Sequence, residues 1–241
     1  EPMTIYTYIN TDIQSLLEQI GNGKYTTESA GVSNANQVNW VGDDTLQAAL
    51  TIMDVSSGAI IATMGGRDYS GELIYQRAMQ ANLGMSTGDS VMDIPYTYAA
   101  TNTTVYDYDM NYKGQVTLQY AIGDSRNTPA LYTYDSVVSK IGTTAMQSYL
   151  TSLGFDASVI ASLNSQYAIG GGTFNVSPTQ LANAYQMLLN GGTYIKAHTI
   201  SKIEFEDGRQ PYVANPTQTR VLSSAASYLM DYMLKLVVDN R

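Results

Sequence analysis

The 241-residue sequence contains no cysteine and only one histidine, His198. The absence of cysteine excludes disulfide bonds, thiolate metal sites and cysteine nucleophiles. With one histidine, zinc sites rich in histidine are excluded, and a Ser-His-Asp triad would have to be built around His198. His198 lies in a strand-like segment, where we expect an ordinary structural histidine. The sequence implies no metal and no organic cofactor.

Positive charge is also scarce. The chain has 12 Lys and Arg residues against 21 Asp and Glu, which gives a formal net charge of −9. The basic residues are scattered, so we expect no nucleic-acid partner. An acidic surface also disfavours adhesion to anionic lipid headgroups.

Long apolar runs are missing as well: none could span a bilayer, and no signal peptide is evident. The chain begins at Glu1-Pro2 without an initiator methionine. We therefore expect it to be an internal part of a longer protein.

The residues that are present are typical of a folded globular domain, with 44% hydrophobic and 14% charged residues. Tyrosine is abundant, with 20 residues against 3 Phe and 1 Trp. Tyrosine suits half-buried strands and groove walls, where the ring packs and the hydroxyl stays hydrated. A lineage bias in residue usage would explain the excess equally well.

Periodicity and turn residues predict strands, then many helices, then strands and a last helix. Residues 46–53 and 59–64 are predicted to form a hairpin with its turn at Ser57-Gly58. The other predicted strands are 3–10 and 193–206; the predicted helices are 11–20 (N-cap Thr11-Asp12), 75–80, 117–122, 128–141, 143–153, 178–189 (opened by Ser177-Pro178) and 223–238; and residues 26–39 and 93–111 are predicted to be irregular. This order is not a βαβα alternation, so it favours an α+β class with an antiparallel sheet and segregated helices.

One compact polar segment, residues 123–129, lies between two predicted helices. Ser125 and Asn127 stand two apart on this loop and could point at one substrate, the first as a proton relay and the second as an amide clamp. The alternative is a plain helix–helix turn in which Asn127 or Thr128 caps the helix before Pro129. A lone Ser-x-Asn favours the turn.

Several segments together resemble the transpeptidase domain of bifunctional, class A penicillin-binding proteins, and they occur in the same order. They are MTIYTYINTDIQ (3–14), LQAALTIMDVSSGAIIATMGGRDY (46–69), YQRAMQA (75–81), PYTYAATNTTVYDYD (95–109), TLQYAIGDSRNTPAL (117–131) and residues 167–209 with their Asn-Gly-Gly. The resemblance implies the β-lactamase/transpeptidase-like fold, a central antiparallel sheet flanked by helices.

In that family three motifs line one cleft: Ser-x-x-Lys with the nucleophile, Ser-x-Asn, and Lys-Thr-Gly on a strand edge. Only the second is present here. By the resemblance, Ser125 would relay a proton and Asn127 would contact a substrate amide, while Arg126 would be a structural or rim residue. None of the six lysines has a serine three residues before it, and none is followed by Thr-Gly or Ser-Gly.

The resemblance also indicates where in the chain the two missing motifs should lie. The nucleophile helix should follow residues 75–81, but the chain runs from Ala81 directly into Asn82-Leu83-Gly84, so about one helix is absent between residues 81 and 82. The Lys-Thr-Gly strand should follow helix 223–238. Removing a central helix would leave a large void, and even a Leu-sized void costs roughly 3–5 kcal/mol. A folded product without that helix is therefore improbable, so a segment left out of the present sequence is favoured over a true deletion. We expect residues 1–40 to be the linker from a preceding glycosyltransferase domain, and 41–241 to be a transpeptidase domain without its nucleophile helix and final strands.

The resemblance implies a D,D-transpeptidase that cross-links peptidoglycan stem peptides through a serine acyl-enzyme and is acylated by β-lactams. The parent protein would be anchored by one N-terminal transmembrane helix, with this domain at the extracytoplasmic face of the bacterial cell membrane. Because Ser-x-x-Lys is missing, the alternative is a non-catalytic binding or scaffolding module of the same fold. A β-lactamase-like hydrolase is a third possibility, against which the Gly-Gly-Arg-Asp-Tyr hairpin and the linker weigh.

Overall fold

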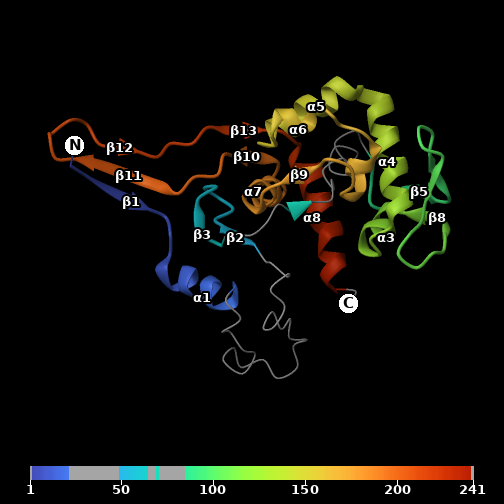
Figure 1. Ribbon diagram of the computed structural model, residues 1–241, viewed down its shortest axis with the longest axis horizontal. Helices are drawn as coiled ribbons and strands as arrows, with labels where there is room; N and C mark the ends of the chain where they lie inside the picture. Colours follow the sequence, from blue (N-terminus) through green and yellow to red (C-terminus); the bar gives the residue numbers. More distant parts are fainter. Residues whose placement is uncertain (1, 22–48, 65–68, 71–84, 240–241) are drawn as a thin grey trace. The chain divides into compact units, whose positions relative to one another are not determined.

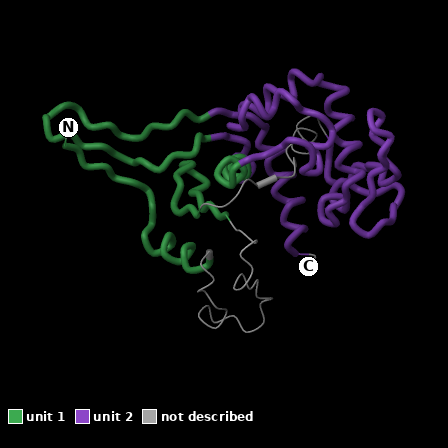
Figure 2. Tube along the Cα trace, in the orientation of Figure 1, with its two compact units in different colours: residues 1–69, 177–186, 195–218 green, residues 70–176, 187–194, 219–241 purple. Residues whose placement is uncertain are grey.

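The computed structural model of the chain describes residues 2–21, 49–64, 69–70 and 85–239 (Figure 1). The fold divides into two compact units, coloured separately in Figure 2. Unit 1 comprises residues 1–69, 177–186 and 195–218, and unit 2 comprises residues 70–176, 187–194 and 219–241. Each unit therefore combines segments that are far apart in the sequence.

The described helices are α1 (Thr11–Gly21), α3 (Leu118–Gly123), α4 (Asn127–Ile141), α5 (Thr143–Ser152), α6 (Ala157–Ile160), the 3-10 helix η1 (Ser165–Ile169), α7 (Pro178–Leu189) and α8 (Ser224–Asp239). The described strands are β1 (Met3–Thr7), β2 (Leu50–Met53), β3 (Ile60–Met64), β4 (Tyr69–Ser70), β5 (Ser90–Asp93), β6 (Tyr96–Tyr98), β7 (Thr103–Val105), β8 (Gly114–Thr117), β9 (Asn175–Val176), β10 (Thr193–Ile195), β11 (Ile200–Phe205), β12 (Tyr212–Val213) and β13 (Gln218–Arg220). This mixture of helices and antiparallel strand pairs confirms the α+β class.

In unit 1 the first strand of the chain pairs with one that lies about two hundred residues later. β1 is antiparallel to β11, with Ile5 opposite Ile203, and β12 pairs with the other edge of β11 (Figure 1). The predicted strand 193–206 is in fact two strands, β10 and β11. Between them His198 forms an isolated bridge with Ala59 and packs edge-on against Tyr8, with ring centroids 5.4 Å apart. The histidine therefore lies between two strands, not within one as the sequence suggested.

The predicted hairpin is present as β2 and β3, and Asp54 organises its turn. One carboxylate oxygen, Oδ1, accepts hydrogen bonds from the Ser57 amide (2.8 Å) and from the hydroxyls of Ser56 (2.7 Å) and Ser57 (2.6 Å). Gly58 follows with φ +72°, a left-handed conformation in which glycine has no Cβ penalty. These bonds, with that of Ser57 first, lower the pKa of Asp54.

Helix α1 contacts this hairpin through the side chain of Gln14, which bonds to both backbone groups of one strand residue, as a paired strand would. Gln14 accepts from the Thr63 amide through Oε1 and donates to the Thr63 carbonyl through Nε2, both at 3.0 Å. The N-cap prediction was one residue too late, because Asn10 Oδ1 accepts from the amides of Asp12 and Ile13. The helix itself spans the predicted residues.

Helix α7 begins with the capping pattern that the sequence predicts. Ser177 Oγ accepts from the Gln180 amide at 3.1 Å, and Gln180 Oε1 accepts from the Ser177 amide at 2.9 Å. On the buried side of α7, Asn183 donates to the Ile195 carbonyl and accepts from the Ala197 amide, both at 2.7 Å. A buried amide that satisfies two backbone groups ties this part of the helix to the chain beyond β10.

Unit 2 is built around α4. Its fully buried residues Ala130, Leu131 and Val137 face a core completed by α5, α6 and η1, and Tyr167 and Phe174 stack with ring centroids 5.1 Å apart. The predicted helices 117–122, 128–141, 143–153 and 223–238 are confirmed as α3, α4, α5 and α8 to within two residues at each end. Short elements α6 and η1 were not predicted.

The prediction that residues 93–111 are irregular was wrong. Strands β6 and β7 form an antiparallel hairpin there, with Thr97 opposite Thr104 and their hydroxyls 3.2 Å apart. Asn102 supplies the turn with φ +53°. Strands β5 and β8 pair on either side of this hairpin. Thr and Tyr are strand-forming residues, so the composition that suggested a loop in fact favours a sheet.

Some predictions fall outside the described residues: helix 75–80, loop 26–39, the start of strand 46–53 and the junction between residues 81 and 82. The division into a linker (1–40) and a transpeptidase domain (41–241) stays a prediction. Among the helices that the structure describes, none combines the length and apolarity that a bilayer crossing requires.

We predict that Gly58→Ala destabilises unit 1 more than Gly208→Ala does. Both glycines have φ near +75°, but a Cβ at Gly58 would lie 2.9 Å from the Ile195 carbonyl oxygen, whereas a Cβ at Gly208 meets nothing within 4 Å. Strain alone should cost about 1 kcal/mol at Gly208, and strain plus overlap about 2–3 kcal/mol at Gly58. Urea unfolding measures both values, and equal losses would contradict the close approach at Gly58.

Candidate functional site

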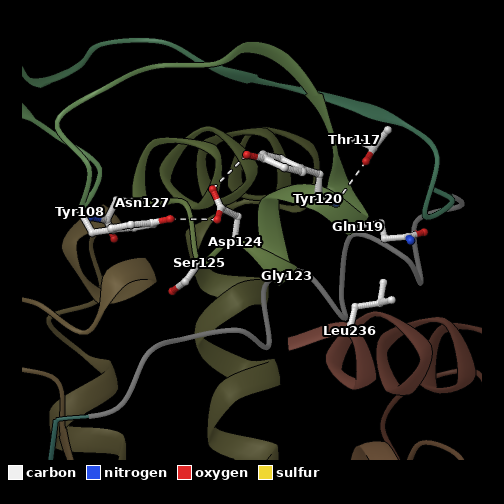
Figure 3. Close-up of a pocket in the computed structure, with 9 residues that line it drawn as sticks. All are labelled: Tyr108, Thr117, Gln119, Tyr120, Gly123, Asp124, Ser125, Asn127 and Leu236. Atoms are coloured by element: carbon white, nitrogen blue, oxygen red, sulfur yellow. Dashed lines mark hydrogen bonds between the residues drawn. The ribbon is translucent and has the colours of Figure 1, made fainter. Parts of the chain in front are cut away.

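Unit 2 contains a cavity of about 830 Å³ at the junction of α3 and α4 (Figure 3). Its lining comes mainly from α3 and the loop that follows it, with one residue from α8. The lining residues are Tyr108, Thr117, Gln119, Tyr120, Gly123, Asp124, Ser125, Asn127 and Leu236. Both residues of the predicted Ser-x-Asn motif therefore line the same cavity.

The loop between α3 and α4 is only three residues long, and backbone hydrogen bonds hold it. The amides of Asp124, Ser125 and Arg126 donate to the carbonyls of Tyr120 (2.9 Å), Ile122 (3.1 Å) and Ala121 (2.9 Å). Ser125 adopts φ +50°, which is uncommon for a residue with a Cβ. This conformation leaves the Ser125 side chain exposed at the cavity.

Arg126, between the two motif residues, is completely buried and lies among four carboxylates. Its guanidinium is 2.9 Å from Asp93, 3.3 Å from Asp107, 2.9 Å from Asp109 and 3.4 Å from Asp124. It also donates to the carbonyl of Asn111. The side chains of Asp93 and Asp107 are as buried as Arg126 itself. We call these five charged residues the Arg126 cluster.

The Arg126 cluster also caps helix α4. Asp107 Oδ1 accepts from the amides of Asn127 and Thr128, the latter at 3.3 Å. The Thr128 hydroxyl lies 2.8 Å from Asp93 and 3.3 Å from Asp107. A carboxylate at a helix N-terminus satisfies free amides and complements the helix dipole. Asp107 thus performs, from twenty residues earlier in the chain, the capping that usually comes from a neighbouring side chain.

The buried carboxylates differ in protonation behaviour. Burial raises the pKa of Asp107, and a hydrogen bond with Asp93 adds to the rise. Burial also works to raise the pKa of Asp93, but hydrogen bonds from Thr128 and Asp107 and the charge of Arg126 bring it below its usual value. This opposite pair of shifts is the behaviour of two close carboxyls that share a proton.

At the more exposed edge of the cluster, a hydrogen bond from Lys113 lowers the pKa of Asp109 far below its usual range, and Arg126 contributes.

The side chain of Asn127 is oriented by a residue outside the Arg126 cluster, because its Nδ2 donates to the Tyr106 carbonyl at 2.9 Å. This bond fixes the direction of the Asn127 amide group at the cavity.

Two tyrosines bracket Asp124 on the cavity wall, one from each side (Figure 3). The hydroxyl of Tyr108 donates to Oδ1 at 3.0 Å, and that of Tyr120 donates to Oδ2 at 3.1 Å. Hydrogen bonding to Asp124 raises the pKa of Tyr108, and burial followed by Asp124 raises that of Tyr120, so both hydroxyls remain donors. Among the described residues that line the cavity, Asp124 is the only one that carries a charge.

The structure places Ser125 and Asn127 at the same cavity, and it changes the interpretation of their neighbours. Arg126 is structural, as one alternative held, but not a rim residue, because it has no exposed surface. The helix–helix turn is present, but neither Asn127 nor Thr128 caps α4. Arg126 occupies the N-cap position, and its side chain makes no capping hydrogen bond. The carboxylate of Asp107 accepts that hydrogen bond from the Asn127 amide instead.

Sequence reasoning missed Asp93, Asp107, Tyr108, Tyr120 and Asp124. The signal in the sequence was Arg126, a charged residue inside a short turn between two apolar helices. A buried arginine requires carboxylate partners, so its position indicates that acidic residues lie close to it. Within the part of the chain that the structure describes, no three acidic or histidine side chains are arranged to hold a metal ion. The acidic groups here surround a guanidinium instead.

Comparison with known proteins gives one family. A family model described as the penicillin binding protein transpeptidase domain matches residues 74–241. Penicillin-binding protein 1A of Streptococcus pneumoniae (strain ATCC BAA-255 / R6) is 33% identical over 265 residues, covering 98% of this chain and 34% of the relative. Penicillin-binding protein 1A/1B of Bacillus subtilis (strain 168) is 27% identical over 256 residues, covering 98% of this chain and 26% of the relative. The chain spans about a third or less of the length of these curated relatives.

Solved structures show the same fold. The crystal structure of penicillin-binding protein 1A from Haemophilus influenzae matches 80% of this chain and 35% of that chain, with a TM-score of 0.65 and 20% identity. Penicillin-binding protein A from M. tuberculosis, as its imipenem acyl-enzyme complex, matches 100% of this chain and 65% of that chain, with a TM-score of 0.74 and 12% identity. The predicted transpeptidase-like fold is confirmed.

We predict that Arg126→Met destabilises unit 2 strongly. Methionine fills much of the same volume but leaves Asp93 and Asp107 buried without their cation, which should cost about 3–5 kcal/mol. Lys140→Met on the exposed side of the same helix is the matched control and should change the free energy of unfolding by no more than about 0.5 kcal/mol. Similar losses in both variants, measured by urea unfolding, would show that the Arg126 cluster is not needed for stability.

We also predict that stability falls as the pH drops from about 5 to 3. The pKa of Asp109 is lowered in the folded state, so the unfolded chain, with carboxyl pKa values near 4, takes up a proton at this position first. The lowered pKa of Asp93 and the raised pKa of Asp107 act on stability in opposite directions. The stabilisation is present above that pH and is lost on acidification. Asp109→Asn should make the dependence shallower when urea midpoints are compared at pH 3, 4 and 5. An unchanged slope in Asp109→Asn would contradict the assignment.

Proposed function

This chain belongs to the family of penicillin-binding protein transpeptidase domains, class A type, and on that premise we propose that it serves as a D,D-transpeptidase. It would cross-link peptidoglycan stem peptides through a serine acyl-enzyme and be acylated by β-lactams. The observation that carries the proposal is the placement of Ser125 and Asn127 side by side at one cavity. By the family resemblance, the domain would act at the extracytoplasmic face of the membrane, anchored through the longer protein.

In this proposal Ser125 relays a proton during acyl transfer. Its hydroxyl is exposed at the cavity, and the loop conformation at φ +50° holds it there. A hydroxyl both donates and accepts, so it can pass a proton between two other groups without acquiring a charge. The Arg126 cluster supports this role because it fixes the backbone on the C-terminal side of Ser125.

Asn127 would contact the peptide substrate. An amide side chain offers one acceptor and two donors in a single plane, which suits the backbone amide of a peptide. The bond from its Nδ2 to the Tyr106 carbonyl sets where Oδ1 points. Held at the first residue of a capped helix, Asn127 needs little reorganisation to bind, which favours affinity.

The nucleophile must come from residues that this sequence does not contain. The alignment with the S. pneumoniae protein spans 265 residues and uses 98% of this chain. Since 98% of 241 residues is about 236, about 29 residues of the relative have no counterpart here. That number would accommodate a helix with its connections, which agrees with our proposal that a nucleophile helix is missing between residues 81 and 82.

A second function is favoured by the absence of Ser-x-x-Lys from the 241 residues. A domain without a nucleophile could still hold a stem peptide through Ser125 and Asn127. It would then be a non-catalytic binding or scaffolding module in the cell-wall machinery. The two functions differ in whether a covalent intermediate forms.

We predict that the protein isolated from the cells that make it carries the missing segment and gains one penicillin on a serine in that segment. Its mass should exceed 26.2 kDa, the mass of the 241 residues, and intact mass spectrometry before and after penicillin measures both properties. A protein of 26.2 kDa that takes up no penicillin would contradict the transpeptidase proposal and favour the binding module.

In the protein that reacts with penicillin, Ser125→Ala should slow acylation by a fluorescent penicillin by about 100-fold or more. This is the usual loss in rate when a proton-transfer group is removed. Ser139→Ala, on the exposed side of α4, is the matched control and should react at the wild-type rate. An unchanged rate in Ser125→Ala would remove Ser125 from the mechanism while leaving the acylation itself established.

A further inference from the structure

Two tyrosines on the segment that precedes the cavity expose their rings to solvent. Tyr106 and Tyr108 are 46% and 69% exposed, whereas Asp107 between them is buried. An aromatic ring that only stabilises the fold gains free energy by being buried. Two large rings that stay exposed on one short segment beside a site therefore indicate contact with a ligand.

The ring of Tyr108 is held in place although it is exposed. Its hydroxyl donates to Asp124 Oδ1 at 3.0 Å (Figure 3), and the guanidinium carbon of Arg126 lies 5.8 Å from its ring centroid. Arg126 is completely buried, so this contact is on the protein side of the ring. Since the hydroxyl is already engaged, what Tyr108 offers a ligand is the apolar surface of its ring.

Tyr106 is held in a similar way, by a second ring. Its centroid lies 6.0 Å from that of Tyr112, with 31° between the ring planes, and the Tyr112 hydroxyl donates to the Val105 carbonyl at 2.8 Å. The carbonyl of Tyr106 accepts from Asn127 Nδ2. The exposed rings thus adjoin the residue that we propose to hold the peptide. We call Tyr106 and Tyr108 the tyrosine platform.

An open aromatic surface suits a flat ligand that is apolar on one face and polar around its rim. A pyranose ring has this form, because the C–H groups of one face can cover an aromatic ring while the hydroxyls stay hydrated. A wholly apolar ligand fits less well, since such ligands bind in concave pockets that bury most of their surface. A sugar ring is also rigid, so it loses little conformational entropy on binding.

We infer that the tyrosine platform binds a sugar ring of the glycan strand that carries the substrate peptide. The inference rests on the proposed function, which supplies the sugar: the stem peptides of peptidoglycan are attached to chains of amino sugars. A peptide held by Asn127 would bring its own glycan close to Tyr106 and Tyr108. Sugar binding needs no nucleophile, so it is tested separately from acylation.

The test titrates the full chain with N,N′,N″-triacetylchitotriose, a neutral trimer of an amino sugar, and with the sugar-free peptide acetyl-D-Ala-D-Ala. Amide shifts of Tyr106 and Tyr108 in ¹H–¹⁵N spectra report binding. The trimer should shift both amides in a saturable way, and an excess of the peptide should not reverse these shifts. Absence of the shifts, or their reversal by the peptide, would overturn the inference.

The penicillin experiment gives an independent result. If the trimer binds and penicillin does not react, the sugar site stands and the transpeptidase proposal fails. If penicillin reacts and the trimer does not bind, the transpeptidase proposal stands and the sugar site fails.

Variants of Tyr108 separate the ring from its hydroxyl. Tyr108→Ala should weaken trimer binding about tenfold, the effect of losing one ring contact, and Tyr108→Phe should stay within about twofold of the wild type. Tyr228→Ala removes an equally exposed ring (69%) from α8 and is the matched control, with wild-type affinity expected. Wild-type affinity in Tyr108→Ala, or equal losses in Tyr108→Ala and Tyr108→Phe, would overturn the inference.

If Tyr108→Ala does not fold, intermolecular NOEs in the wild-type chain decide. The protons H1, H3 and H5 share one face of a β-linked N-acetylglucosamine ring. Contacts from these protons to the ring of Tyr106 or Tyr108 support the site, and sugar contacts only to other residues overturn it.

Discussion

The structure of the candidate site depends on the burial of one guanidinium. Arg126 has no exposed surface, and its partners Asp93 and Asp107 are buried with it. Removing such charges from water is expensive, and the expense is offset only when the geometry satisfies nearly every donor and acceptor. Here the guanidinium, the Thr128 hydroxyl and two helix amides together provide the donors that these carboxylates require. The consequence is one narrow set of positions for the loop that carries Ser125 and Asn127.

That constraint separates the scaffold of the site from its chemistry. Arg126, Asp93 and Asp107 are buried and hold the backbone, whereas Ser125 and Asn127 line the cavity. Ser125 can remain in a left-handed conformation because the residue after it is anchored on several sides, and strain of this kind persists where the surroundings determine the backbone. A pre-positioned hydroxyl and amide are what proton relay and peptide binding need, so the rigid scaffold supports the proposed D,D-transpeptidase role.

Much of the fold could be predicted from the sequence because local chemistry determines it. Ser177 and Gln180 form the capping box that opens α7, and the hairpin turn at Ser57-Gly58 is present, since both depend on residues only a few positions apart. The β6–β7 hairpin was missed because its strands are three residues long, and the signal of an alternating pattern is weak at that length. The family resemblance located Ser125 and Asn127. The carboxylates around Arg126 could not be assigned, because Asp93 and Asp107 come from different segments and only the folded chain brings them together.

The most direct test of this account is amide hydrogen exchange at the start of α4. The first amides of a helix have no partner within it and normally exchange fast. We predict that Asn127 and Thr128, whose amides donate to buried Asp107, are protected as strongly as Leu131 in the core of the same helix. Thr144 provides the comparison, because α5 follows Gly142 without a side-chain cap. Exchange at Asn127 and Thr128 as fast as at Thr144 would contradict the claim that the Arg126 cluster fixes the Ser125–Asn127 loop.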